Sequence, residues 1–262
     1  MRHLAQSLRC SGFILLAMAL CGVGAQAQNQ TALTAGEIVA RMLAKNGERQ
    51  TALQHYASER TYELHYSGTG GEHHAKMVVD VDYTAPGRKH FTVISESGSK
   101  VLCKEVLRKL VDGEEQTAAK SDWQRTMFSP ETYNLELLGR EQLDGISTWV
   151  LKVDPKVDSK IGYRGKVWIS TDDFATVRVL GEPEKNPSWL LNRTSFDSRY
   201  MRRGEIWLPS RNISTSHVRI GGDARVTIDY GDYEVLSVTG SSVGNAVATA
   251  PAVKADLTSL VR

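Results

Sequence analysis

The sequence predicts a mainly β fold with helices, built around one large antiparallel sheet of about ten to eleven strands. Apolar and polar residues alternate along most of 133–233, and within that stretch Trp149, Leu151 and Val153 share one side. Such alternation gives a sheet one apolar and one solvated face. Turn sequences such as Asp144-Gly145 separate the runs, so neighbouring strands are expected to pair as hairpins.

Residues 1–27 predict a signal peptide for export. A positive start precedes an apolar run over 13–23, which is shorter than the roughly 20 residues that span a bilayer. Ala25-Gln26-Ala27 then has the small-x-small pattern of a cleavage site. The alternative is a lipoprotein signal with Cys21 lipidated, but Leu20 stands where a small residue is expected. We expect cleavage near Ala27 and a periplasmic or secreted location.

The composition that remains after cleavage narrows the class of protein. The 30 basic residues then balance 30 acidic ones, which excludes the basic footprint of nucleic-acid binding. Cys103 is the one cysteine left, so no internal disulfide can form. A chain of 235 residues can still bury roughly 70–75% of its unfolded surface in a core. We expect one domain over 28–238 and a flexible tail over 239–262, where no periodicity appears.

The first element expected in the domain is an amphipathic helix. Thr34 and Glu37 can form a capping box at its start, and Asn46-Gly47 suits a helix end. A second helical segment is expected over 48–56, with its apolar residues turned inward.

Strands follow, interrupted once by a helical insert. Residues 61–66, 75–83 and 89–96 alternate as three antiparallel strands. From Ser99 to Val111 the apolar residues recur at steps of three and four, so this insert is predicted as a helix packed on the apolar face of the sheet. The strands of the main sheet are predicted at 134–140, 146–154, 166–170, 175–180, 196–200, 205–220 and 225–230.

Residues that could carry catalysis or bind a metal are scattered. Gly240-Ser241-Ser242-Val243-Gly244 matches the nucleophile-elbow pattern, but no histidine follows His217 and no helix pattern follows the motif. His73-His74 could suggest a metal ligand pair, but adjacent residues on a strand point to opposite faces, and a solvated turn is the expected position. We therefore predict no enzyme, no catalytic residue, no metal site and no cofactor.

The apolar stripes of the predicted strands would face one side of a single curved sheet. Two alternatives stay open: a closed core filled by side chains, or an open sheet whose concavity is partly filled by helices and leaves a lipid-sized cavity. The residues predicted to line such a cavity are Tyr62, Leu64, Tyr66, Met77, Val79, Val81, Phe91, Val93, Leu102, Val106, Leu137, Trp149, Leu151, Val167, Ile169 and Val177.

The order of elements resembles the outer-membrane lipoprotein-sorting family, the LolA/LolB-like carriers, over 34–236. The resemblance rests on the N-terminal helix, three strands, the insert over 99–121, and a meander through Gly165-Lys166-Val167-Trp168-Ile169-Ser170 and Ile206-Trp207-Leu208-Pro209. It implies a half-open antiparallel barrel with helices as a lid over an apolar cavity for acyl chains. It also implies an arginine inside the barrel that ties the lid shut when empty. Arg60, on the apolar phase of the first strand, is one candidate for that role.

On this resemblance we expect a monomeric periplasmic carrier that binds a lipid or lipoprotein acyl chain in outer-membrane trafficking. The partners implied are an inner-membrane transport complex and an outer-membrane acceptor. The alternative is a sensor or interaction domain of the same fold, like the RseB-like regulators of envelope stress, without transport.

Overall fold

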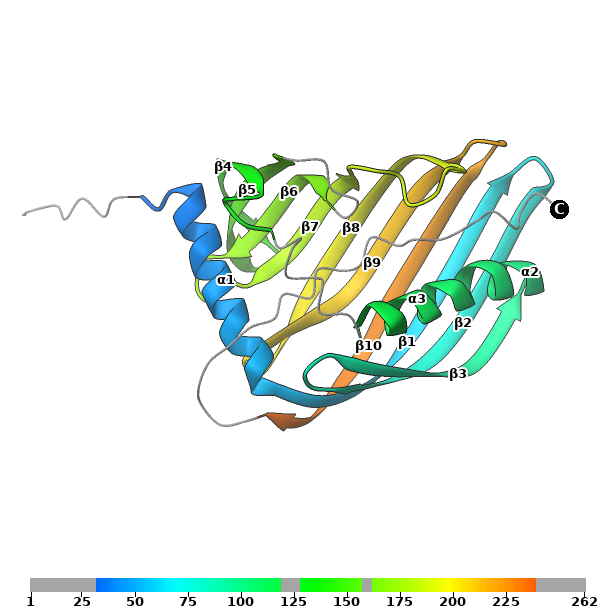
Figure 1. Ribbon diagram of the computed structural model, residues 1–262, viewed down its shortest axis with the longest axis horizontal. Coiled ribbons are helices and arrows are strands. Elements are labelled where there is room, and N and C mark those ends of the chain that lie inside the picture. Colours follow the sequence, from blue (N-terminus) through cyan, green and yellow to red (C-terminus); the bar gives the residue numbers. More distant parts are fainter. Residues whose placement is uncertain (1–31, 119–127, 157–161, 239–262) are drawn as a thin grey trace, which may run out of the picture. The chain divides into compact units, whose positions relative to one another are not determined.

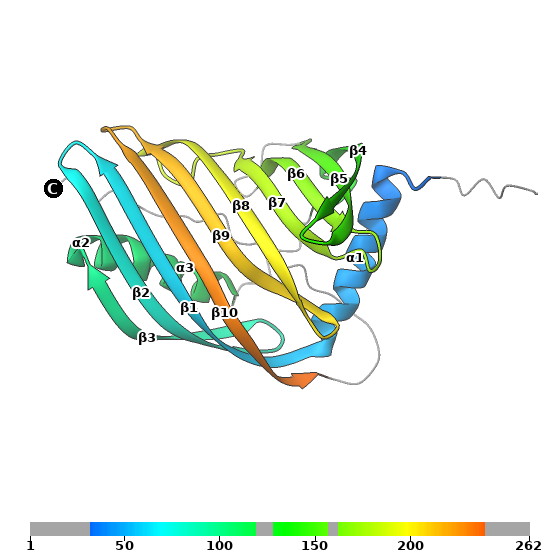
Figure 2. The same ribbon diagram turned by 180° about the vertical axis from the view of Figure 1, so that it is seen from behind.

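The computed structural model of the protein describes residues 32–118, 128–156 and 162–238. The predicted signal peptide, the tail over 239–262 and its Gly240-Ser241-Ser242-Val243-Gly244 motif lie outside these residues. Within the described ranges, ten strands form one antiparallel sheet in the order β3-β2-β1-β10-β9-β8-β7-β6-β5-β4. The edge strands β3 and β4 do not pair with each other, so the sheet stays open, and the mainly β, half-open fold is confirmed (Figures 1 and 2).

The topology follows from where the chain enters the sheet. From its middle, the first three strands form hairpins toward one edge: β1 (Leu53–Gly68), β2 (Gly71–Thr84) and β3 (Arg88–Gly98). The chain then resumes at the opposite edge and returns strand by strand until β10 pairs with β1. These strands are β4 (Tyr133–Leu143), β5 (Ile146–Pro155), β6 (Tyr163–Ser170), β7 (Thr176–Pro183), β8 (Leu191–Arg203), β9 (Ile206–Val218) and β10 (Asp223–Val238).

Helix α1 (Ala35–Ala52) starts as the sequence predicts and ends later. The capping box is present: Glu37 N donates to Thr34 Oγ1 at 3.2 Å, and Thr34 N donates to Glu37 Oε2 at 2.8 Å. The predicted end at Asn46-Gly47 is wrong, because Asn46 Oδ1 accepts from Arg49 Nη1 at 3.0 Å and the helix continues through the next turn. Of the second helical segment predicted over 48–56, residues 48–52 are the end of α1, and the prediction is wrong for 53–56, because strand β1 begins at Leu53.

The helical insert comprises α2 (Lys100–Leu102), the π-helical turn η1 (Cys103–Leu107) and α3 (Arg108–Ala118). Ser99 caps it, its Oγ accepting from Leu102 N at 3.4 Å. The helix predicted from the periodicity over 99–111 continues to Ala118, within the insert over 99–121 on which the resemblance rests. None of the helices in the described part of the chain is both long and apolar enough to cross a membrane.

Both α1 and the insert lie on the same face of the sheet, which we call the inner face (Figures 1 and 2). Under the insert, the strands β1–β3, β9 and β10 contribute to a first apolar cluster with Leu102, Val106 and Leu107. Under α1, the strands β5–β7 contribute to a second cluster with Ile38, Val39 and Met42. Each helical element therefore covers its own half of the inner face.

Candidate functional site

The candidate site centres on Arg60, which lies among apolar neighbours beneath the insert. Side chains at every second position of β1 point to the inner face, and Arg60 occupies one of these positions between Ser58 and Tyr62. Its side chain is 1% exposed. A buried guanidinium costs several kcal/mol unless an opposite charge and hydrogen bonds compensate it. The partners of Arg60 therefore decide what this site can do.

Its main partner is Glu114, which α3 brings to the sheet. Arg60 Nη1 donates to Glu114 Oε1 at 2.8 Å, and Lys89 Nζ of β3 donates to the same oxygen at 2.7 Å. Tyr62 OH donates to the other oxygen, Oε2, at 3.4 Å. The carboxylate, 9% exposed, thus joins the helix to two strands. We call the contact between Arg60 and Glu114 the latch.

The charge state of the latch is fixed at neutral pH. Burial by itself would raise the pKa of Glu114, but the positive charges of Arg60 and Lys89 outweigh that cost and lower the pKa to about 2. Burial likewise disfavours the charged form of Arg60, yet the carboxylate of Glu114 raises the arginine's pKa well above its ordinary value. The latch is therefore a fully ionised pair.

Aromatic rings surround the guanidinium. Its Cζ lies 4.6 Å from the ring centre of Tyr230 and 5.5 Å from that of Phe91, and its Nη2 donates to Tyr56 OH at 3.4 Å. Ring faces attract cations through their quadrupole. We refer to Arg60 with Tyr56, Tyr62, Phe91 and Tyr230 as the Arg60 cage. Burial raises the pKa of both Tyr62 and Tyr230, so their hydroxyls stay protonated and can only donate or accept hydrogen bonds.

Two polar atoms in this region have no partner. Among the described residues, the buried side-chain atoms that lack a hydrogen bond are Ser58 Oγ, Arg60 Nε and Asn212 Oδ1. The first two belong to successive inner-face positions of β1. Buried polar groups nearly always have a hydrogen-bond partner, so two unpaired polar atoms beside a buried charge need an explanation.

The structure separates the residues predicted to line a cavity into groups. One group packs in the cluster under the insert: Tyr62, Leu64, Tyr66, Met77, Val79, Val81, Phe91, Leu102 and Val106. A second group packs in the cluster under α1: Trp149, Leu151, Val167 and Ile169. The two groups occupy different halves of the inner face rather than one continuous stripe.

The other three predicted residues lie outside these two clusters, for two different reasons. Val93 and Leu137 pair with the inner-face residues Val79 and Leu151 and so lie on the same face, but they belong to the edge strands and each is 37% exposed. Val177 falls at the shift between β6 and β7 and packs with Val150 and Trp168 in a small third cluster. A bulge adds one residue to a strand and breaks the period of two on which the prediction relied.

Sequence reasoning proposed Arg60 but did not find Glu114 or Lys89. A signal for Glu114 was present: it continues the face of the insert on which Leu107 and Leu110 lie, at helical spacing. A carboxylate at an apolar helix position matches an arginine at an apolar strand position. The two together could have pointed to a buried pair.

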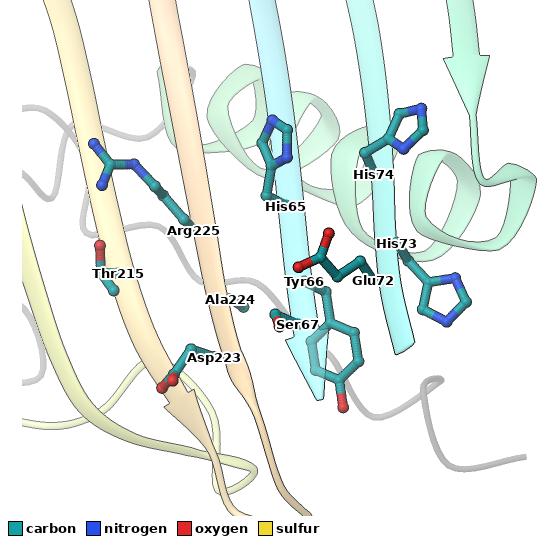
Figure 3. Close-up of a pocket in the computed structure, with 10 residues that line it drawn as sticks. All are labelled: His65, Tyr66, Ser67, Glu72, His73, His74, Thr215, Asp223, Ala224 and Arg225. Atoms are coloured by element: carbon teal, nitrogen blue, oxygen red, sulfur yellow. The ribbon is translucent and has the colours of Figure 1, made fainter. Parts of the chain in front are cut away.

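A pocket of about 280 Å³ lies away from the latch, at the ends of β1, β2, β9 and β10 (Figure 3). Here His65 pairs across strands with His74, with ring centres 6.5 Å apart, whereas His73 stacks on Tyr66 at 6.2 Å. The adjacent histidines thus point to opposite faces. They lie on β2, not in the predicted turn. No group of three or more His, Cys, Asp or Glu side chains in the described residues could hold a metal ion.

No protein-family model and no curated protein matches the sequence. A comparison of the structure with solved structures does find matches. A DUF1329 family protein from Desulfovibrio piger has 14% identity and a TM-score of 0.37, covering 79% of this chain and 93% of its own. A LolA superfamily protein from Nitrosomonas europaea has 14% identity and a TM-score of 0.37, covering 79% and 96%. A putative outer membrane lipoprotein-sorting protein domain from Vibrio parahaemolyticus has 12% identity and a TM-score of 0.35, covering 79% and 91%.

Two of these structures are named for the group of proteins that the order of elements resembles. Identities of 14% or less and TM-scores below 0.4 transfer no role to this chain.

Proposed function

We propose that the protein is an exported carrier that binds a lipid or lipoprotein acyl chain between the sheet and the insert. In the empty protein, the latch would hold the insert on the sheet. The observation that carries this proposal is the position of the latch: a buried ion pair joins a helix to the sheet above an apolar cluster. Delivery would involve an inner-membrane complex and an outer-membrane acceptor.

Apolar contact alone is sufficient for such a cargo. Each buried methylene contributes about 0.8 kcal/mol, so an acyl chain of about sixteen carbons would contribute roughly 12 kcal/mol before costs. Association costs roughly 4–15 kcal/mol, so binding by apolar contact alone is favourable over most of this range and never so strong that release is prevented. No covalent step is required.

An ion pair suits a latch because its net contribution to stability is small. The attraction between buried charges is largely offset by the cost of removing them from water. The geometry is nevertheless specific, since the pair forms only when α3 lies over β1 and β3. A ligand that enters beneath the insert can therefore shift the closed state toward an open one with a modest gain in binding energy.

Native mass spectrometry of protein purified from the periplasm tests the proposal. We expect about one lipid or acylated peptide per chain, which organic extraction would identify. Protein that carries no lipid and takes up no fluorescent fatty acid would contradict the proposal and favour the sensor or interaction domain.

A matched pair of variants locates the binding face. Val79 and Asp80 are neighbours on β2, but Val79 is fully buried on the inner face and Asp80 is exposed. Val79→Asn places a polar group against the ligand and should weaken uptake of a fluorescent fatty acid by about tenfold. Asp80→Asn should leave uptake unchanged, and circular dichroism would verify that both variants fold. Equal uptake by the two variants would exclude this half of the inner face.

A further inference from the structure

The charges in and beside the Arg60 cage do not balance. Two cations, Arg60 and Lys89, donate to one carboxylate, that of Glu114. Lys89 is only 21% exposed and Arg60 is buried, so solvent neutralises little of the excess. An apolar ligand needs no such excess of positive charge, because acyl chains bind by area alone. The site therefore has more positive charge than it needs to hold the insert on the sheet or to bind a neutral lipid.

Two buried polar atoms without hydrogen-bond partners lead to the same conclusion. Arg60 Nε is a buried donor without an acceptor, and Ser58 Oγ is a buried hydroxyl without a partner one inner-face position away. A carboxylate of the protein itself, Glu114, already occupies the Nη1 side of the guanidinium. An arginine can donate through five N–H groups in a fixed fork that suits oxyanions. The closed state thus leaves part of this fork unused.

We propose that the Arg60 cage is the binding site for the anionic headgroup of the lipid, with a phosphate group replacing the carboxylate of Glu114 when α3 moves away. Arg60 and Lys89 would then bind the phosphate oxygens, Ser58 Oγ would donate to one of them, and the acyl chain would lie along the apolar cluster under the insert. A phosphate monoester carries close to two negative charges at neutral pH and matches the two cations. This inference rests on the proposed carrier function and adds the class of lipid to it.

Glu114 has two functions in this scheme. It compensates the cations while the protein is empty, and it competes with the headgroup for the same donors. The ligand would therefore release the insert directly, because it removes the contact that holds α3 to β1 and β3. A neutral lipid would also have to displace the insert, but it would leave Arg60 and Lys89 without an anion once Glu114 moves away.

Binding of matched sixteen-carbon amphiphiles tests this inference. We would measure the affinity of hexadecyl phosphate, of neutral 1-hexadecylglycerol and of inorganic phosphate by displacement of a fluorescent fatty acid and by calorimetry, below the critical micelle concentrations. We expect hexadecyl phosphate to bind about tenfold more tightly than hexadecylglycerol, since hydrogen bonds to charged groups are the strong ones. Inorganic phosphate should bind far more weakly than either.

Variants separate recognition from folding. Arg60→Met should remove the preference for hexadecyl phosphate, so that the two amphiphiles bind with similar affinity, and Lys89 still pairs with Glu114 in that variant, so no carboxylate is orphaned. Glu114→Gln should raise the affinity for hexadecyl phosphate, the opposite of what a purely structural role would cause. Lys76→Met is the control, because Lys76 is an exposed lysine on β2 that pairs with Glu63. It should change neither affinity.

The outcomes distinguish this inference from the carrier proposal. Equal binding of the two amphiphiles to the wild-type protein would overturn the headgroup site and leave the carrier function standing. Failure of both amphiphiles to bind would overturn the carrier function itself. Inorganic phosphate that binds as tightly as hexadecyl phosphate, with the same dependence on Arg60, would assign the cage to a free anion and overturn the lipid headgroup. If Arg60→Met does not fold, Lys89→Met must reduce the preference for hexadecyl phosphate, or the inference is wrong.

Discussion

Both helical elements on the inner face end near an arginine–carboxylate pair, and the two pairs differ in burial. At the end of α1, Arg49 Nη2 lies 3.2 Å from Asp173 Oδ2, and the two side chains are 12% and 23% exposed. At the latch, Arg60 and Glu114 are 1% and 9% exposed. Asp173 also accepts a hydrogen bond from Trp207 Nε1 at 2.7 Å, so it keeps a partner if Arg49 is lost.

This difference in burial distinguishes an ion pair that only stabilises the fold from one whose carboxylate another anion can replace. The pair at α1 is partly exposed, so water can reach either side chain and reduce the cost of losing the other. The latch lies in a low-dielectric region, where loss of either partner leaves a charge that only another charge can compensate. We therefore expect α1 to remain in place through its apolar contacts, and the insert to respond to any anion that competes for Arg60.

Removal of Glu114 should have the largest effect on stability. Glu114→Ala leaves Arg60 buried without an opposite charge, and breaking a buried pair in this way costs roughly 3–5 kcal/mol. Urea denaturation at neutral pH measures the change in the free energy of unfolding. Glu115→Ala is the matched control on the same helix, because Glu115 pairs with the exposed His90 and its loss should cost less than about 1 kcal/mol.

A double variant examines the cause of that loss. If the loss arises from the uncompensated charge, Arg60→Met combined with Glu114→Leu should recover most of it, since apolar residues can replace a buried pair with little cost. Equal losses in Glu114→Ala and in the double variant would show that the helix packing, rather than the charge, accounts for the effect.

The pH dependence of stability should be the next largest effect. The folded protein lowers the pKa of Glu114 from 4.5 to about 2, so the unfolded chain takes up the proton first as the pH falls. The contribution to stability is therefore complete above about pH 4.5 and is lost as the pH falls toward about 2, with a total of roughly 3 kcal/mol. Urea denaturation at pH 7 and pH 3 would detect about 2 kcal/mol of this total, because the folded carboxylate is still largely ionised at pH 3. Glu114→Gln should lack this part of the pH dependence, and an unchanged slope would assign it to other carboxylates.

The sequence predicts the features of single helices and strands, because these depend on local periodicity. The capping box at Thr34, the apolar phase of β1 and the amphipathic insert all follow from spacings within one element. The division of the inner face into two halves cannot be predicted from such spacings, because the pairing of β1 with β10 joins segments far apart in the chain. A bulge separates Val177 from the face of Val179 for a related reason: one extra residue changes the phase of a strand without a clear mark in the sequence.

The candidate site, too, can be predicted only in part from the sequence. Arg60 is recognisable as an exception in its strand, and Glu114 as an exception in its helix. That the two meet depends on how the insert lies across β1 and β3, which no local pattern specifies. A buried charge in one element therefore predicts that a partner exists, but only the tertiary structure identifies it.

Disruption of the pair at α1 should have the smallest effect. Asp173→Asn removes the charge opposite Arg49, and its one amide oxygen can still accept either from Trp207 Nε1, which donates to Oδ2 at 2.7 Å, or from Ala175 N, which donates to Oδ1 at 3.2 Å. We expect a loss of about 1 kcal/mol in the free energy of unfolding, with no change in the binding of any lipid. Urea denaturation and uptake of a fluorescent fatty acid would measure the two quantities. A loss as large as that of Glu114→Ala, or altered uptake, would show that α1 is released together with the insert and that the two halves of the inner face act as one.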